Sequence, residues 1–412
     1  MRDLCLGLDP VDFDIATDLR PDVVMAAFPE GRARDARLGA VRLDPMAWPV
    51  VITTLRGEAD YHDHRHPSRI WFVDTPAEDA QRRDFTCNAI YWDPLADVVL
   101  DPCGGRADLE QRTLRTIGVP ATRFREDALR LLRAWRFAAR LGFGLEPATR
   151  SAMVDAAPLL SHLSGERCYE ELTRTFTGPG RGQALRALVE LGFAAVLLPE
   201  VAAMDGVSQP PEYHPEGDVL THVCLVLEHC PSDDPILAWS AVLHDVGKPP
   251  TWRVAEDRIR FDGHDCLSAT MAEAILLRMG APREVRQAVV EICRDHIRMA
   301  ALPGMRPRRR EAWLRTPLFG KHLEFHRADC LGSHGQLSIY ETAKAELAAL
   351  PPIRPTLLTG ADALALGVPQ GPMVGQILRM ALAALDELPE REPSRETALA
   401  LLRELVRRTV KP

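Results

Sequence analysis

The sequence predicts an α+β N-terminal region with a mixed sheet, followed by a mostly α-helical remainder. Near the start, LCLGLDPVDFDIATDLRPDVV contains a segment of alternating polarity that is typical of a strand, and VRLDPMAWPVVITTLRGEADYHDHRHPSRIWFV predicts two strands around a polar loop. From Arg125 onward the apolar residues recur at the helical period, as in REDALRLLRAWRFAARLGF. A chain of 412 residues is also too long for one hydrophobic core, so we expect several domains.

The composition is that of a globular protein kept in a reducing compartment. Hydrophobic residues make up 46% and charged residues 26%, and the net charge of −8 argues against a uniformly basic nucleic-acid binder. Nine cysteines without a CxxC pair indicate free thiols. No apolar run approaches the roughly 20 residues that cross a bilayer, and the acidic N-terminus is unlike a signal peptide. We therefore expect a cytoplasmic protein with no membrane partner.

Two carboxylates stand two residues apart near the start, Asp12 and Asp14. In a strand both would project from one face about 6–7 Å apart, a spacing that suits Mg²⁺ bound together with substrate phosphates. Two solvated aspartates on an exposed strand are the alternative that spacing alone favours. Further on, Glu58–Pro67 is rich in histidine and acidic residues and is predicted to be a solvated loop without a metal ligand.

The stretch RRDFTCNA carries Arg83, Asp84 and Asn88 at close spacing. Arginine can clamp phosphates, while aspartate and asparagine can hydrogen-bond a ribose hydroxyl. A helix capped by Asp84 is the alternative interpretation. Asp127 and Arg130 are three residues apart in a predicted helix, where the pair could read the amino group and ring nitrogen of cytosine or adenine. A surface salt bridge is at least as consistent with that spacing.

Three motifs in fixed order carry a family resemblance: RRDFTCNAIYWDP, DPCGGRADL and REDALRLLRAWRFAARLGF. Together they resemble the bacterial class of CCA-adding tRNA nucleotidyltransferases and their relatives, the bacterial poly(A) polymerases. The similarity runs to about Gly192. It implies a nucleotidyltransferase palm that uses CTP, ATP and the tRNA 3′ end as substrates, with no DNA partner.

The resemblance also implies residue roles. Asp12 and Asp14 would hold two Mg²⁺ ions that activate the tRNA 3′-hydroxyl and stabilise the pyrophosphate leaving group. The nucleotide-binding set, which includes the EDxxR pair that would select CTP and ATP without a template, comprises Arg2, Asp3, Arg83, Asp84, Asn88, Asp127 and Arg130.

The start of the chain departs from the family pattern. Met1-Arg2-Asp3 resembles the end of the family's Gly-Gly-x-Val-Arg-Asp loop, but the Gly-Gly pair and the strand before it are absent. We therefore expect an N-terminally incomplete palm whose first strand is missing. Either the start codon is placed too far downstream, or the polypeptide lacks part of its sheet and of its triphosphate cradle.

A second constellation follows in leucine-rich, helical sequence: His222 in LTHV, the pair His244-Asp245 in HDVGK, His264 in DGHD and Asp329 in HRADC. Imidazole plus carboxylate suits Mn²⁺, Ni²⁺, Co²⁺ or Mg²⁺. The stretch resembles an HD-domain phosphohydrolase. The resemblance implies His222, His244, Asp245 and Asp329 as metal ligands, His264 and His296 as candidates for a second metal, and Lys248 as a phosphate contact.

The HD resemblance implies metal-assisted hydrolysis of a phosphate monoester or diester, such as a 2′,3′-cyclic or terminal phosphate at an RNA end. Four domains are expected: the incomplete palm (1–118), a helical neck for base and RNA binding (119–200), the HD domain (201–345) and a helical tail (346–412). The most basic cluster either binds the tRNA backbone or forms a solvated helix start; it comprises Arg306, Arg308, Arg309 and Arg310.

The leading hypothesis is a tRNA nucleotidyltransferase that adds CCA and carries an attached HD phosphohydrolase. A poly(A) polymerase shares the catalytic motifs and is the nearest alternative. The alternative from another class is an HD phosphohydrolase whose nucleotidyltransferase half is vestigial.

Overall fold

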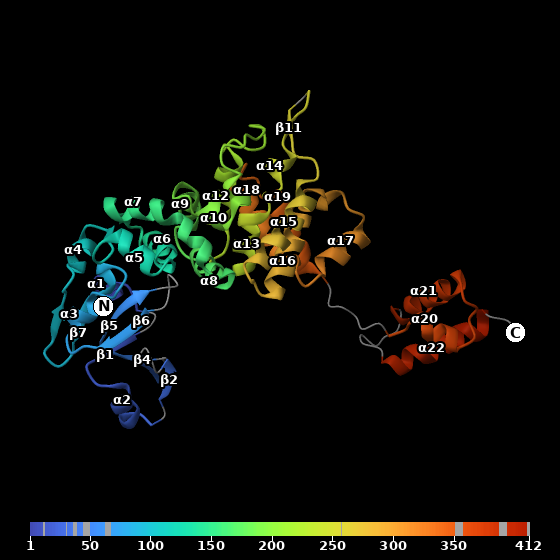
Figure 1. Cartoon of the computed structure of the whole chain (residues 1–412). Coiled ribbons are helices and arrows are strands. Elements are labelled where there is room, and N and C mark those ends of the chain that lie inside the picture. The colour runs from blue at the N-terminus through green and yellow to red at the C-terminus, as the bar shows by residue number, and fades with distance from the viewer. Residues whose placement is uncertain are drawn as a thin grey trace. The chain divides into compact units, whose positions relative to one another are not determined.

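The computed structural model describes residues 1–412 except 11–12, 30, 36–38, 44–49, 62–66, 257, 351–356, 387–393 and 410–412. The chain divides into two compact units, Met1–Ala345 and Glu346–Pro412. The first unit begins with a small mixed sheet and continues as packed helices, and the second is helical (Figure 1). The predicted class, α+β followed by helices, is confirmed.

The sheet near the N-terminus has the strand order β1-β4-β3-β2. Strand β1 runs parallel to β4, whereas β3 is antiparallel to both of its neighbours. Helix α2 covers one face of the sheet, where Val24 packs with apolar residues of β3 and β4. These elements are β1 (Phe13–Thr17), α2 (Pro21–Ala27), β2 (Arg32–Asp35), β3 (Ala40–Leu43) and β4 (Val50–Thr54).

Two antiparallel hairpins follow the sheet. The prediction of a solvated loop at Glu58–Pro67 is wrong for the described residues, because Glu58–Tyr61 belongs to β5 and Pro67 begins β6; the rest of the segment lies outside the described residues. Glu58 is held there by Arg56 at 2.7 Å and by the Tyr61 hydroxyl at 2.7 Å, so the acidic residues are not all solvated. The strands are β5 (Arg56–Tyr61), β6 (Pro67–Phe72), β7 (Tyr91–Asp93) and β8 (Val98–Leu100).

Short elements connect the hairpins to the long helices. In the segment TLRTIG, Thr113–Leu114 form β9, which pairs in parallel with β10. Helix α1 precedes the sheet, and α3 and α4 flank the second hairpin (Figure 1). These elements are α1 (Arg2–Cys5), α3 (Pro76–Ala80), the 3₁₀ helix η1 (Thr86–Asn88), α4 (Gly105–Glu110), β9 (Thr113–Leu114) and β10 (Gly144–Leu145).

One hydrophobic core runs from residue 85 to residue 328 without a break at residue 200. Phe176 lies at its middle and makes edge-to-face contacts with Trp135 (ring centroids 5.9 Å apart) and Trp239 (5.4 Å). The helices between residues 120 and 205 are α5 (Pro120–Glu126), α6 (Leu129–Leu141), α7 (Pro147–Ala156), η2 (Ala157–His162), α8 (Gly165–Phe176), α9 (Arg181–Glu190), α10 (Phe193–Leu197) and α11 (Pro199–Ala202).

The same core continues into a second group of helices, in which α12 packs against α9, α13 and α18. A short hairpin projects from this group beside α14 (Figure 1). The elements are α12 (Val219–His229), α13 (Pro235–Leu243), α14 (Lys248–Thr251), β11 (Arg253–Val254), β12 (Ile259–Arg260), α15 (His264–Arg278), α16 (Arg283–Asp295), η3 (His296–Gly304), α17 (Pro307–Leu314), α18 (Phe319–Leu331) and α19 (Ser338–Ala349).

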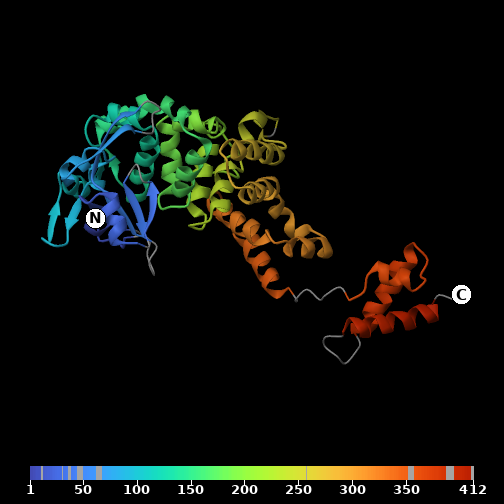
Figure 2. The same cartoon turned by 60° about the horizontal axis from the view of Figure 1, so that its bottom comes forward.

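The second unit is a three-helix cluster with a core of its own, seen in red in Figure 2. Its helices are α20 (Gly360–Ala365), α21 (Pro372–Asp386) and α22 (Arg395–Thr409). Thr359 and Asp362 form a capping box at the start of α20. Among the residues described, no helix in either unit combines the length and apolarity needed to cross a bilayer.

Candidate functional site

Asp84 lies at the centre of a buried polar cluster, with a side chain in contact with three other residues. Its Oδ2 accepts hydrogen bonds from Arg133 Nη2 at 2.6 Å and Nε at 2.8 Å, and its Oδ1 accepts from Asn88 Nδ2 at 3.0 Å. Burial alone would raise the pKa of Asp84, but the Arg133 charge and these hydrogen bonds lower it to about 2. Asp84 is therefore ionised at neutral pH, and it is not the N-cap of the following 3₁₀ helix.

Arginine side chains gather beside this cluster. Arg2 Nη1 donates to Asn88 Oδ1 at 2.7 Å, and Arg2 Nε pairs with the buried Asp3 at 2.7 Å. The guanidinium groups of Arg2 and Arg133 lie 4.8 and 5.5 Å from the centre of the Phe137 ring. A group of guanidiniums held by short hydrogen bonds is suited to binding a polyanion such as a triphosphate.

The Asp84–Arg133 pair should stabilise the first unit in a pH-dependent way. Because the folded pKa of Asp84 is depressed from 3.8 to about 2, the pair contributes about 2 kcal/mol above pH ~4, and this contribution is lost as the pH falls towards 2. Asp84→Asn is therefore expected to accelerate hydrogen exchange in peptides spanning residues 84–137 at pH 7. The difference from the parent chain should shrink at pH 3.

An Asp155→Asn chain is the matched control, because Asp155 is an exposed aspartate and undergoes the same chemical change. A difference between the Asp84→Asn and parent chains that stayed constant from pH 7 to pH 3 would contradict this electrostatic origin.

Arg83 lies on the other side of Asn88. Its Nε binds Asp79 Oδ2 at 3.0 Å, its Nη1 donates to the Asn88 carbonyl at 3.0 Å, and its guanidinium stacks on Tyr91 at 4.6 Å. These contacts hold the Arg83 side chain in one orientation. The sequence-predicted set Arg2, Asp3, Arg83, Asp84 and Asn88 is thus brought together in one region.

The predicted helix from Arg125 is in fact two helices. Helix α5 ends at Glu126, Asp127 is extended (φ −142°, ψ 104°), and α6 begins at Leu129. The break arises because Asp127 Oδ1 accepts the Leu129 N–H at 3.0 Å, an interaction that competes with helix continuation. Asp127 and Arg130 therefore lie at a helix junction, and the carboxylate partner of Arg130 is Glu126 at 2.8 Å.

The pair predicted to read the base is partly buried at this junction. Arg130 Nη2 donates to the Arg82 carbonyl at 3.2 Å, and its guanidinium lies 5.9 Å from the Tyr61 ring of β5. Burial raises the pKa of Asp127. A cleft of about 300 Å³ adjoins the junction and is lined by Glu58, Ala59, Asp60, Tyr61, Thr122, Arg125 and Glu126.

The other predicted groups near the substrate regions are less enclosed. Asp14 is on β1 with an exposed side chain, whereas Asp12 lies outside the described residues. Arg306 is the residue before α17, and Arg308, Arg309 and Arg310 occupy the first turn of that helix. A basic helix start is thus observed. No contact with RNA is implied by its geometry alone.

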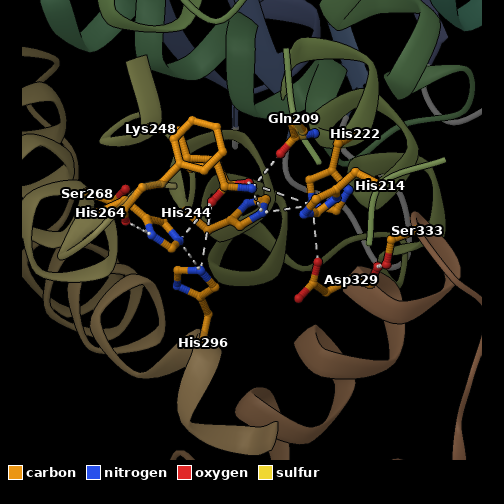
Figure 3. A network of polar contacts seen from close by, with 12 residues as sticks. Gln209, His214, His222, His244, Lys248, His264, Ser268, His296, Asp329 and Ser333 are labelled. Carbon is orange, nitrogen blue, oxygen red and sulfur yellow. Dashed lines mark hydrogen bonds and ion pairs between the residues drawn. The ribbon is translucent and has the colours of Figure 1, made fainter. Parts of the chain in front are cut away.

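Six predicted metal ligands converge in the second half of the first unit, from four helices and the turn after α13. We call this group the HD centre: His222, His244, Asp245, His264, His296 and Asp329. Figure 3 shows the imidazole rings pointing toward one another. The group forms two clusters, one with His222, His244 and Asp329 and the other with Asp245, His264 and His296, each with ligand atoms within 4.8 Å of one another.

The histidines present one ring nitrogen to the centre. In His244, His264 and His296, Nδ1 lies 2.7–2.9 Å from the carbonyl three residues earlier, which leaves Nε2 to face the cluster. The Nε2 atoms of His264 and His296 are 3.3 Å apart. An imidazole that donates Nδ1–H to a carbonyl and keeps an Nε2 lone pair is prepared to bind a metal.

Asp245 lies between the two clusters. Its Oδ2 is 3.2 Å from His244 Nε2, and its Oδ1 is 3.5 Å from His264 Nε2. Lys248 Nζ is 2.7 Å from Oδ2, but neither carboxylate oxygen accepts a hydrogen bond of good geometry from the described residues. A carboxylate with both oxygens facing imidazole nitrogens in a buried site fits a bridge between two cations.

Gly247 brings the second cluster within reach of Asp245. A Cβ at this position would lie 2.5 Å from the His264 carbonyl and 2.8 Å from the Ser268 nitrogen. Only glycine therefore allows the turn after Asp245 to pack directly on the start of α15, which begins at His264. This close packing explains why the HDVGK motif has glycine at position 247.

The electrostatics favour positive charge at the first cluster. Burial alone would lower the pKa of His222, but the neighbouring carboxylates of Asp329 (3.2 Å) and Glu216 (2.8 Å) raise it to about 9. The pKa of Asp329 is lowered despite its burial, chiefly by His222. A metal cation bound at this cluster would be stabilised by the same carboxylates.

The sequence reasoning missed three polar residues of the loop before α12. Gln209 accepts from Lys248 Nζ at 2.6 Å, and Glu216 Oε1 lies 2.8 Å from His222 Nδ1 and 2.9 Å from His214 Nδ1. Glu216 therefore orients His222 as the backbone carbonyls orient the other histidines. The available signal was the stretch HPEGD shortly before LTHV, whose polar residues could have been interpreted as partners of the metal ligands.

Family models match two parts of the chain. Residues 1–115 match the poly A polymerase head domain, and residues 142–204 match the probable RNA and SrmB-binding site of polymerase A. The sheet lies within the first matched region, and helices α7 to α11 lie within the second. Both regions are therefore similar to parts of poly(A) polymerases, and the relatives below are CCA-adding enzymes.

The curated relatives are similar over about half of the chain. The CCA-adding enzyme of Geobacillus stearothermophilus is 43% identical over 197 residues, 48% of each chain. The multifunctional CCA protein of Xanthomonas campestris pv. campestris (strain B100) is 38% identical over 242 residues, 57% of this chain and 58% of the relative. The matched region thus spans about half the length of these relatives.

Solved structures resemble nearly the whole chain. The Bacillus stearothermophilus CCA-adding enzyme in complex with CTP matches with a TM-score of 0.65 at 29% identity, covering 98% of this chain and 90% of that one. The Thermotoga maritima CCA-adding enzyme complexed with tRNA matches at 18% identity and a TM-score of 0.55, covering 98% and 89% of the two chains. The second likeness shows the fold alone.

Proposed function

We propose that this protein is a template-independent tRNA nucleotidyltransferase that adds CCA to tRNA 3′ ends from CTP and ATP. The observation that carries the proposal is the similarity of about half of its chain to a CCA-adding enzyme, at 43% identity over 197 residues. Its physical support is the cluster of Arg2, Arg83, Asp84 and Asn88, which offers guanidiniums for phosphates and amide and carboxylate groups for a ribose.

In this proposal Asp12 and Asp14 hold Mg²⁺, which would supply charge neutralisation at the reacting phosphate when bound. The exposed carboxylate of Asp14 is an oxygen donor of the kind that Mg²⁺ prefers. Asp127 and Arg130 select the base from the helix junction. The arginines at the start of α17 contact the tRNA backbone. We retain palm (1–118), neck (119–200), HD domain (201–345) and tail (346–412) as the proposed division.

The test is nucleotide incorporation on tRNA that lacks its 3′ CCA. With Mg²⁺ and both nucleotides, the full chain is expected to restore the complete CCA end, read by sequencing of the product. The name of the matched head domain keeps a poly(A) polymerase as the second candidate. A product of adenosines alone would favour that candidate, and no product in a chain that still hydrolyses phosphate esters would favour a vestigial nucleotidyltransferase half.

We also propose that the HD centre hydrolyses a phosphate monoester or diester, such as a 2′,3′-cyclic or terminal phosphate. The observation that carries this proposal is Asp245, whose two oxygens face two imidazole clusters. Divalent cations (Mn²⁺, Ni²⁺, Co²⁺ or Mg²⁺) would supply Lewis acidity toward a phosphoryl oxygen and a source of nucleophilic water when bound.

The protein residues of the HD centre have separate tasks in this proposal. His222, His244 and Asp329 hold one cation, and His264 and His296 hold the other with Asp245 shared between them. Lys248, buried at the edge of the centre, neutralises Asp245 and contacts a substrate phosphate from the same position. Because the centre is buried among apolar helices, each of these charges acts in a low dielectric.

A further inference from the structure

Two surface segments border the HD centre and are anchored in it. The loop 205–218 contributes Gln209, which binds Lys248, and His214, whose ring centroid is 4.9 Å from that of His222. The hairpin 252–261 leaves α14 and returns to α15 through Phe261, whose ring lies 5.4 Å from Lys248 Nζ. In Figure 1 this hairpin and the loop before α12 project from the same end of the helical group.

Both segments expose aromatic side chains next to these anchors. Tyr213 is 52% exposed and Trp252 is 42% exposed, and Val254 beside Trp252 is 70% exposed. Within the described part of 205–345, large hydrophobic residues are exposed at only three further positions, Leu225, Leu277 and Ile297. Half of the exposed apolar side chains of this region are therefore concentrated beside the HD centre.

The two aromatic rings are held in fixed orientations. Trp252 Nε1 donates to the Ser208 carbonyl at 3.3 Å, beside the Gln209 that binds Lys248. The Tyr213 hydroxyl accepts from Arg258 Nη1 at 2.8 Å, and the Arg258 guanidinium lies 5.2 Å from the Tyr213 ring centre. Rings that are fixed by hydrogen bonds and still face water are prepared to stack on a planar ligand with little further ordering.

The charge around these rings limits the size of that ligand. The loop 205–218 has four carboxylates and no lysine or arginine. Of the three arginines on the hairpin, Arg253 is paired with Asp262, Arg258 donates to Tyr213, and Arg260 also has a partner. An extended polynucleotide needs several cations along its backbone, whereas one base needs only a ring face. The segments therefore suit a single nucleoside better than a long strand.

We propose that Tyr213 and Trp252 form a base-stacking rim through which the HD centre selects nucleoside phosphate esters. The inference rests on the proposed hydrolase function and adds the specificity element to it. The phosphate reaches the metal ligands and Lys248, while the base stacks on the rim formed by the loop and the hairpin.

The experiment compares two substrates with the same cyclic phosphate and ribose. One is adenosine 2′,3′-cyclic phosphate, and the other is methyl ribofuranoside 2′,3′-cyclic phosphate, which lacks the base. Hydrolysis by the Mn²⁺-loaded full chain is measured for Tyr213→Ala, Trp252→Ala and the double variant. The matched control is Trp92→Ala, because Trp92 is 49% exposed on the distant strand β7.

Each rim variant is expected to raise KM for the adenosine ester by about 5- to 100-fold, the range for loss of one base–aromatic stack, with little change in kcat. KM for the base-free ester should not change, and Trp92→Ala should behave as the parent chain. Equal effects on both substrates, or none on either, would overturn the rim.

Failure of the hydrolase proposal would look different. In that case the parent chain hydrolyses neither ester. Calorimetry of adenosine ester binding to the Mn²⁺-loaded chain then tests the rim proposal without any hydrolysis. Weaker binding to Trp252→Ala than to Trp92→Ala supports the proposal, and equal binding overturns it.

Discussion

Asp245→Asn is expected to reduce phosphate-ester hydrolysis by more than about 100-fold while leaving nucleotide addition intact. The side chain keeps its size, but it loses the charge that faces His244 on one side and His264 on the other. One substitution would therefore weaken the binding of both cations. The measurements are the hydrolysis rate with Mn²⁺ and the number of Mn²⁺ ions retained per chain, which should fall.

The control for this change is Asp233→Asn, because Asp233 is an exposed aspartate outside both the HD centre and the two rim segments. The control should hydrolyse at the parent rate. Full hydrolysis by Asp245→Asn with unchanged metal content would remove Asp245 from the centre and with it the bridging arrangement proposed above.

Asp14→Ala is expected to lower CTP and ATP incorporation by about 10³-fold or more, because a carboxylate that holds a catalytic cation has no substitute in alanine. Hydrolysis at the HD centre should be retained, because Asp14 lies on β1 and the HD ligands lie beyond residue 221. The measurement is extension of tRNA lacking its CCA end, followed at subsaturating nucleotide.

Asp18→Ala is the comparison variant, since Asp18 is an exposed aspartate directly after β1. It should extend tRNA at close to the parent rate. If Asp14→Ala extended tRNA as well as Asp18→Ala does, the metal-binding role proposed for Asp14 would be refuted.

Much of the fold followed from periodicity. Alternation predicted the strands near the start, and the three- and four-residue spacing of leucines predicted the helices that form the continuous core. The errors fell where side chains compete with the backbone. Asp127 binds the Leu129 N–H and divides a predicted helix, and Glu58 is kept in a strand by Arg56 and Tyr61.

The metal-type ligands were visible in the sequence because each stands in a short motif within leucine-rich helices. Their supporting residues were not. Glu216 orients His222 from a loop without regular period, and Arg133 binds Asp84 across 49 residues. The HPEGD stretch marks Glu216 only as a polar residue near LTHV, and nothing local marks Arg133, since both contacts depend on how separate elements pack.

The sequence by itself determined which chemical groups this protein has: paired carboxylates at Asp12 and Asp14, an arginine-rich nucleotide stretch, and histidines with HDVGK. Only the tertiary structure decided how they combine. It divided six ligands into two clusters, placed Asp245 of the second beside His244 of the first, and brought two exposed aromatic rings near them. The physical reason is that motif spacing is a property of one segment, whereas ligand geometry is set by the packing of several helices around a common core.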